Sequence, residues 1–164
     1  MNRPPNLRKL KAGGRRSAAA PRPYLEEIAL VRVRFQEVDS LRIVWHGHHV
    51  SYFEEGRRAF GRRFGLDYPV FVEHRLAAPV VQLSVNYLAP ARMNDVLAVT
   101  ARLFRSEAAK LEFAYEIRRS GDNLLLATGS TIQAFTTLDG ELILQPPPLL
   151  IERYREWESL WLQP

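Results

Sequence analysis

Residues 50–65 read VSYFEEGRRAFGRRFG, and the expected fold is built around this stretch. Its apolar side chains recur at spacings of three, seven and four residues, which predicts that they share one face of a helix. These side chains are Val50, Phe53, Phe60 and Phe64. Gly65 supplies a C-terminal stop, and Pro69 follows it. Gly56 lies inside the helix, where glycine costs about 0.5–1 kcal/mol relative to alanine, so we expect the helix to approach a sheet closely there.

On both sides of this helix the apolar period falls to two, which is typical of half-buried strands. The alternation is found at residues 29–35, 81–87, 97–103 and 111–117, and less regularly at 124–137. Pro, Gly, Asn and Asp mark the turns between these segments. A further short strand is predicted around residues 71–77, and apolar residues after a run of three prolines predict a terminal helix over 149–160.

This order of elements defines the expected fold class. Because no strand–helix–strand alternation is present, the sheet is not doubly wound. We expect an α+β fold in which a five- to six-stranded antiparallel sheet wraps one long helix, with an additional C-terminal helix. Such a sheet leaves its edges open, and pairing of subunits would cover them, so we predict a homodimer or homotetramer.

Composition excludes several classes of function. The chain has 164 residues and no Cys, which rules out disulfides, a thiol nucleophile and thiolate metal sites. No apolar run approaches the roughly 18 residues that a membrane span needs. The basic N-terminus lacks the apolar segment of a secretory signal, so we expect a cytoplasmic protein.

The net charge of +5 is concentrated at the N-terminus. Residues 1–23 hold seven Lys and Arg residues and no acid, so the rest of the chain carries slightly more acidic than basic side chains. A nucleic-acid-binding domain shows a basic face on its folded part, and none is expected here. The prolines and glycines of residues 1–23 predict a disordered basic tail before a single domain of residues 24–164. The tail is either inert or an electrostatic handle for an acidic partner.

The densest chemistry lies in residues 39–49, DSLRIVWHGHH, directly before the long helix. The first turn of a helix presents unpaired N–H groups and a partial positive charge, which can hold a developing oxyanion. Gly47 permits a close approach to the backbone. Asp39 can act as a nucleophile or a general base, or it can simply stabilise a turn. His46 is either a base that orients water or a ring that only packs.

Segments around this loop resemble the 4-hydroxybenzoyl-CoA thioesterase-like hotdog family, and more closely its Tol–Pal-associated acyl-CoA thioesterase branch. They read VRFQEVD at 33–39, VWHGH at 44–48, YFEEGR at 52–57, and NYLAPAR at 86–92 followed by Asp95. The resemblance spans about residues 28–145. It implies a hotdog fold and an enzyme that hydrolyses an acyl thioester of CoA or of acyl carrier protein to free acid and thiol, without a cofactor.

The resemblance also implies roles for residues of the loop. Asp39 stands at the position of the family's catalytic aspartate, and His46 stands at the histidine of the Tol–Pal-associated branch. The N–H groups of His46 and Gly47 would bind the thioester carbonyl. The side chains and backbone expected to contact the substrate are those of Trp45, Gly47, His48 and Glu54.

The sequence departs from the family's pattern at four positions. Arg42 replaces a residue that is usually Gly, His48 replaces Asn, and His49 replaces Tyr. Phe35 stands where some members have a Tyr, so no phenolic hydroxyl is available there. The departures at Arg42, His48 and His49 leave open a non-catalytic acyl-thioester-binding protein. A second alternative is a different enzyme on the same scaffold, a hydroxyacyl-thioester dehydratase.

The histidines at positions 46, 48 and 49 also raise the question of a metal site. Side chains at spacings of one and two residues on a loop do not converge easily on one ion. We therefore expect no metal.

Overall fold

The structure is a computed structural model that describes residues 22–163, so most of the predicted tail, residues 1–21, lies outside the described part. The strands are β1 (Tyr24–Arg32), β2 (Leu76–Ala77), β3 (Val80–Tyr87), β4 (Val96–Phe104), β5 (Lys110–Arg119), β6 (Leu125–Ala134) and β7 (Thr136–Thr137). The helices are the 3-10 turn η2 (Phe35–Glu37), α1 (His48–Phe64), α2 (Tyr68–Glu73) and α3 (Pro148–Glu156). No helix among these is long and apolar enough to cross a bilayer.

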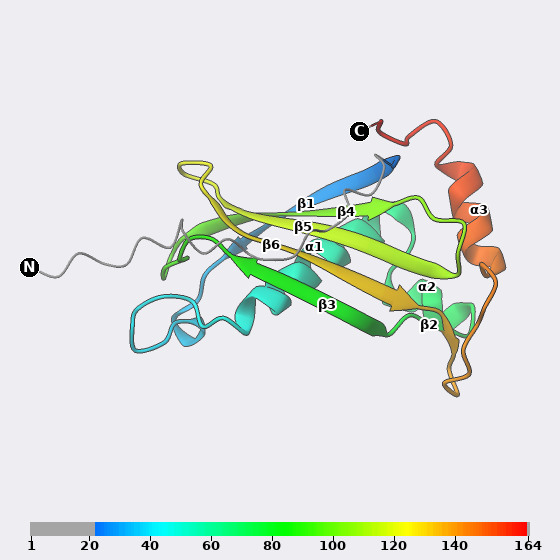
Figure 1. Cartoon of the computed structure of the whole chain (residues 1–164), viewed down its shortest axis with the longest axis horizontal. Helices are drawn as coiled ribbons and strands as arrows, with labels where there is room; N and C mark the ends of the chain where they lie inside the picture. The colour runs from blue at the N-terminus through cyan, green and yellow to red at the C-terminus, as the bar shows by residue number, and fades with distance from the viewer. Residues whose placement is uncertain (1–21, 164) are drawn as a thin grey trace, which may run out of the picture.

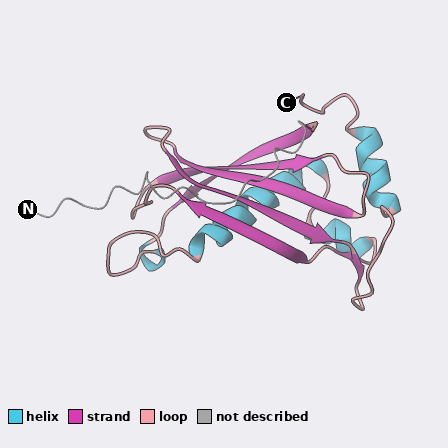
Figure 2. Ribbon diagram, viewed as in Figure 1, coloured by secondary structure: helices cyan, strands magenta, loops and turns pink. Residues whose placement is uncertain are grey.

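Five of the strands form one antiparallel sheet in the order β1-β4-β5-β6-β3. The helix α1 runs along one face of this sheet, and α3 lies at its end (Figure 1). The short strands β2 and β7 pair with each other in a separate two-stranded sheet. Figure 2 shows the resulting division into one helical layer and one strand layer. The predicted α+β architecture is thereby confirmed.

The predicted apolar stripe of α1 forms the centre of the core. Phe53 and Phe60 are almost fully buried, and each buried side chain of this size contributes about 1.5–3 kcal/mol. The expected close approach occurs at Gly56, where an added Cβ would lie 2.9 Å from Cγ1 of Val99 on β4. On β6, a Cβ at Gly129 would overlap the ring of Phe53. Two glycines therefore let α1 lie directly on the sheet.

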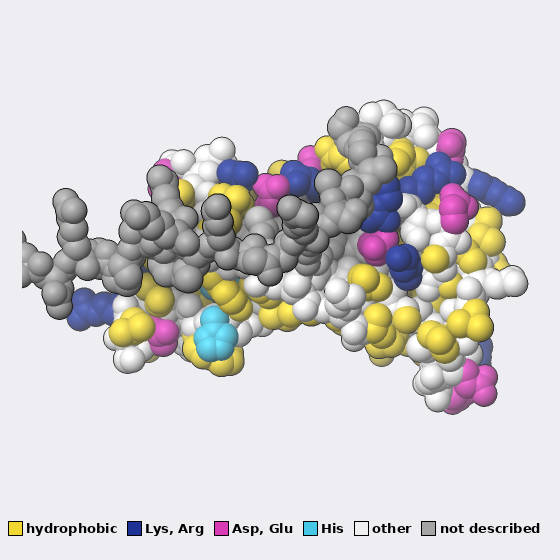
Figure 3. Space-filling view, viewed as in Figure 1, with side chains coloured by type: hydrophobic (Ala, Val, Ile, Leu, Met, Phe, Trp, Pro, Cys, Tyr) yellow, Lys and Arg dark blue, Asp and Glu magenta, His cyan; other side chains and the backbone are white. Residues whose placement is uncertain are grey.

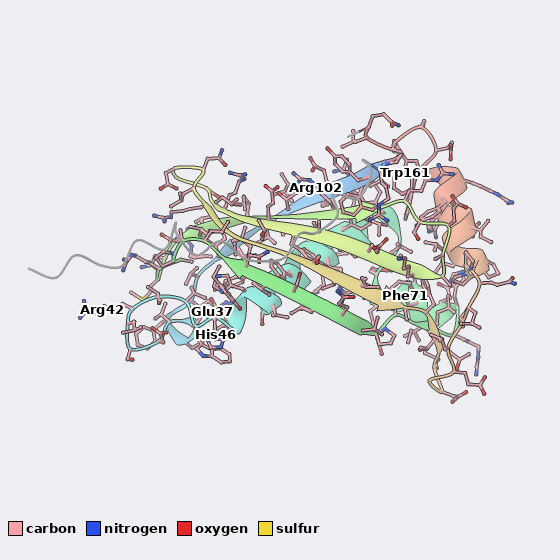
Figure 4. The ribbon with its side chains drawn as sticks, in the orientation of Figure 1. Glu37, Arg42, His46, Phe71, Arg102 and Trp161 are labelled. Carbon is pink, nitrogen blue, oxygen red and sulfur yellow. The ribbon has the colours of Figure 1, made fainter. Side chains whose placement is uncertain are left out.

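The opposite face of the sheet carries a cluster of charged side chains. Arg102 on β4 lies between Glu26 and Glu116, with an N–O distance of 2.8 Å to each carboxylate (Figure 4).

Two residues of the predicted tail, Arg22 and Pro23, also belong to the folded part by their contacts. Arg22 pairs with Glu112 at 2.5 Å, and the carbonyl of Pro23 accepts a hydrogen bond from the backbone N–H of Arg105.

The prediction of a short strand around residues 71–77 was largely wrong. The segment begins with α2, and only Leu76 and Ala77 are extended. Pro69 lies in the first turn of α2, where the lost N–H has no helical acceptor, so it starts this helix. Phe71 is buried against Phe135, which gives α2 its inward face. Alternation cannot distinguish a six-residue helix from a strand.

Two predicted boundaries also move. The first strand runs from Tyr24 to Arg32 rather than over 29–35, because the N–H of Val33 bonds to the carbonyl of Asp95 and the chain leaves the sheet. The terminal helix ends at Glu156 rather than near residue 160.

The strand β3 is one edge of the sheet, and within the described residues it pairs only with β6. Val81, Leu83 and Tyr87 on this strand are large apolar side chains that remain exposed. Hydrophobic side chains gather along the side of the molecule that β3 follows (Figure 3). This edge is open, as the sequence predicted, and its exposed side chains are apolar.

Candidate active site

The loop between β1 and α1 is a small hairpin with Asp39 at its turn. A bridge joins Val38 to Val44, and the N–H of Asp39 bonds to the carbonyl of Ile43 at 2.9 Å. The turn closes through a 2.9 Å bond from the N–H of Arg42 to the carbonyl of Asp39. Arg42 has a φ of 60°, in the left-handed region that favours glycine, which explains in physical terms why Gly is usual there.

The carboxylate of Asp39 is half-buried and partly engaged. Its Oδ1 accepts a 2.8 Å hydrogen bond from the N–H of Leu41, which is an Asx turn. Its Oδ2 accepts no hydrogen bond from any residue between 22 and 163. Asp39 therefore stabilises the turn, as one of the two sequence-based alternatives predicted, and this leaves its Oδ2 without a hydrogen-bond partner among the described residues.

The N-terminus of α1 supplies the backbone donors. The N–H groups of His48, His49 and Val50 bond to carbonyls three residues back, whereas those of His46 and Gly47 donate no hydrogen bond within the described chain. These two unpaired groups are the donors that the sequence proposed for an oxyanion.

Gly47 is glycine for a reason that the sequence did not reveal. A side chain at Gly47 would overlap the six-membered ring of Trp45, which lies over the backbone at that point. Trp45 is half exposed, and its ring is 4.7 Å from that of His46 and 5.6 Å from that of His48, between centroids. The indole thus forms a wall beside the two unpaired N–H groups.

His46 is fixed through its backbone rather than through its ring. Its carbonyl accepts bonds from the hydroxyl of Tyr87 at 3.1 Å and from Nδ1 of His49 at 3.2 Å, while its imidazole is exposed. Burial lowers the pKa of His49, so this ring is neutral at neutral pH and donates from Nδ1. Figure 4 labels His46 and Glu37, which both lie toward the N-terminal end of α1.

Sequence reasoning missed Glu37 and Tyr52, which join the hairpin to the helix. The hydroxyl of the buried Tyr52 donates to the carboxylate of Glu37 at 2.9 Å, and the N–H of Arg34 donates to the same carboxylate at 2.7 Å. The carbonyl of Glu37 accepts from the N–H of Trp45 at 2.9 Å. Burial, and then the bond to Glu37, raises the pKa of Tyr52. Fifteen residues separate the pair in sequence, so no local pattern marks it.

Glu54 lies in the second turn of α1, apart from these contacts. Its two carboxylate oxygens pair with Arg57 at 3.2 and 2.5 Å. No group of three His, Asp or Glu side chains between residues 22 and 163 is placed to hold a metal ion.

Comparison with known proteins places this geometry in a family. The profile of the thioesterase-like superfamily matches residues 33–153. The chain belongs to that superfamily. Acyl-CoA thioester hydrolase YbgC of Escherichia coli O6:H1 is 27% identical over 95 residues, which are 58% of this chain and 71% of that protein. The chain is thus a homologue of acyl-CoA thioester hydrolases, and the resemblance seen in the sequence is confirmed.

Solved structures of other proteins share the fold. Hypothetical protein TT1821 from Thermus thermophilus superposes with a TM-score of 0.71 at 30% identity, over 84% of this chain and 99% of that one. The DHNA-CoA thioesterase of Staphylococcus aureus superposes with a TM-score of 0.73 at 23% identity, over 82% and 92% of the two chains. The expected hotdog architecture is therefore confirmed.

Proposed function

We propose that this protein hydrolyses acyl-CoA thioesters, with Asp39 as nucleophile or general base. The observation that carries the proposal is the placement of Asp39 on a hairpin whose second strand leads directly into the unpaired N–H groups of His46 and Gly47. Acyl transfer needs these two parts, a carboxylate and an oxyanion site. Homology to proteins named acyl-CoA thioester hydrolases supports the same chemistry.

The reaction uses the chain's own groups. The thioester carbonyl lies at the N–H groups of His46 and Gly47, which stabilise its oxygen as negative charge develops. Asp39 attacks the carbonyl carbon directly or takes a proton from an attacking water. The C–S bond then breaks, CoA leaves as the thiolate, and a proton reaches its sulfur. On the direct route water then hydrolyses the mixed anhydride formed on Asp39, which releases the acid and restores the carboxylate. His46, exposed beside the donors, orients the water or carries that proton.

The assembly is proposed to be a homodimer that pairs through β3. The exposed apolar side chains of β3 and its open edge suit a second copy of the same strand in antiparallel register. Because Tyr87 at the end of β3 bonds to the carbonyl of His46, this contact would adjoin the candidate site. Light scattering of the wild type beside Leu83→Glu tests the pairing, and a monomeric wild type would contradict it.

Thiol release from a panel of acyl-CoA esters tests the activity, with wild type beside Asp39→Asn. We expect the variant to lose at least about 10²-fold in turnover, because the amide can neither attack nor take a proton. The matched control is Asp122→Asn, since Asp122 also accepts a bond from the N–H two residues on, at 3.1 Å, in a turn far along the chain. The control should retain activity.

Two outcomes would contradict the proposal. The first is no thiol release by the wild type with any ester of the panel. The second is equal turnover by Asp39→Asn and the wild type, which would leave Asp39 with the turn role alone.

A further inference from the structure

A hollow lies at the opposite end of α1 from Asp39. It is a cavity of about 700 Å³ between α1, α2 and the strand pair β2 and β7. Arg62, on its rim, lies nearly four turns beyond His48, which is about 20 Å along the helix axis. None of the residues that line it belongs to the hairpin or to the first turns of α1. The cavity is therefore distinct from the candidate active site, and its size is that of a small-molecule pocket.

The walls of this cavity are mostly apolar. Helix α2 contributes Phe71, whose place near the far end of the molecule is labelled in Figure 4. The other apolar lining residues include Leu66, Leu76, Ala78, Pro79 and Leu138. Thr136 and Thr137 from β7 are polar members of the lining. Walls of this kind accept a hydrocarbon or aromatic body.

The rim of the cavity is basic. Arg57, Arg58 and Arg62 line it from α1, and Asp67 is the acidic residue among its lining side chains. Arg57 is already neutralised by its two contacts with Glu54. The rim therefore leaves Arg58 and Arg62 as the arginines that a negatively charged ligand can contact.

Arg58 and Arg62 differ in how free they are to bind an anion. Arg58 pairs with Glu55 at 3.0 Å, but both side chains are exposed, at 59% and 43%, and such a pair is weak in water. Arg62 has no acidic partner within the described residues. An anion can therefore bind Arg62 without displacing an existing ion pair, and Arg58 lies one helical turn away to assist.

We infer that this cavity binds an apolar carboxylic acid, with the carboxylate at Arg62 and the hydrocarbon body between α2 and the β2–β7 pair. A guanidinium group binds a carboxylate through two parallel hydrogen bonds. The choice of a carboxylate over other single anions rests on the proposed function, because thioester hydrolysis releases such an acid. The cavity and its charges do not depend on that function.

Isothermal titration calorimetry with octanoate tests the inference. Wild type is compared with Arg62→Gln, and the control is Arg155→Gln, which removes an equally exposed arginine from α3, outside the cavity. We expect octanoate to bind the wild type and the control alike, and Arg62→Gln to weaken binding at least about tenfold. 1-Octanol, which lacks the negative charge, should bind the wild type and Arg62→Gln equally. Absence of octanoate binding, or equal binding by wild type and Arg62→Gln, would overturn the inference.

Two further titrations separate this inference from the proposed activity. Octanoate is not a thioester, so its binding does not require turnover, and Asp39→Asn should bind it as the wild type does. Loss of binding in Asp39→Asn with retention in Arg62→Gln would place the acid at the hairpin and overturn the inference. Octyl phosphate should bind more weakly than octanoate, and tighter binding of the phosphate would overturn the choice of a carboxylate.

Discussion

At its N-terminal end α1 is tied to the rest of the molecule by directional hydrogen bonds, whereas at its C-terminal end it is held mainly by aromatic packing. Tyr52 reaches the carboxylate of Glu37, and Tyr87 reaches the carbonyl of His46. At the other end Phe60 and Phe64 lie against Trp157, with ring centroids 6.4 and 5.7 Å apart.

The two ends of α1 thus separate the roles of hydrogen bonds and of apolar packing. Hydrogen bonds fix groups in distance and angle, as a reaction requires, while apolar packing is less directional and supplies most of the stability. Substitutions at the N-terminal end should therefore change turnover more than stability. Substitutions at the C-terminal end should do the reverse.

The largest expected effect is at the packed end. Phe60→Ala removes a fully buried ring and should lower the free energy of unfolding by about 3–5 kcal/mol. Urea denaturation measures this, and the exposed Phe35→Ala is the control, with an expected change within about 0.5 kcal/mol. A selective loss of turnover in folded Phe60→Ala, without loss of stability, would reverse the comparison.

A smaller effect is expected at the hydrogen-bonded end. Tyr52→Phe removes the donor to Glu37 and should lower the free energy of unfolding by about 1–2 kcal/mol. It should also lower kcat with little change in KM, because Glu37 positions the hairpin rather than the ligand. Tyr115→Phe is the matched control, since its buried hydroxyl contacts that of Thr131 at 3.0 Å, away from the hairpin. Equal kcat values for the two variants would show that the Glu37–Tyr52 bond is merely structural.

The smallest effect concerns the turn of the hairpin. Arg42→Gly should raise the free energy of unfolding by about 0.5–1 kcal/mol, because glycine adopts a φ of 60° without steric cost. Thermal unfolding followed by circular dichroism measures the gain. Arg42→Ala keeps the unfavourable φ and should not show it, and an equal gain in both variants would trace the effect to the lost charge.

The sequence predicts the central part of the fold well because the pattern there has one physical cause. A single stripe on α1 and alternation along β4 and β5 both report burial against the same core. Gly56 also predicted a close contact with the sheet, and Val99 lies beside it in the structure. The prediction was wrong at α2, where six residues are too few to reveal their period.

The candidate site was predictable only in part. Asp39 and the N–H groups of His46 and Gly47 lie within nine residues, so a local motif could propose them, although their catalytic roles stay a prediction. The Glu37–Tyr52 bond and the arginine-rimmed cavity join distant segments of the chain. Their formation depends on packing, which no periodicity encodes.

The contact of Gly56 with β4 has a mechanical consequence. Gly56 is the midpoint of α1, and about one turn before it the ring of Phe53 covers Gly129, so both glycine contacts between helix and sheet lie near the centre of the helix. The helix extends about 12 Å on either side of Gly56. Any tilt of α1 about Gly56 would therefore move its hairpin end and its arginine-bearing end by equal amounts in opposite directions.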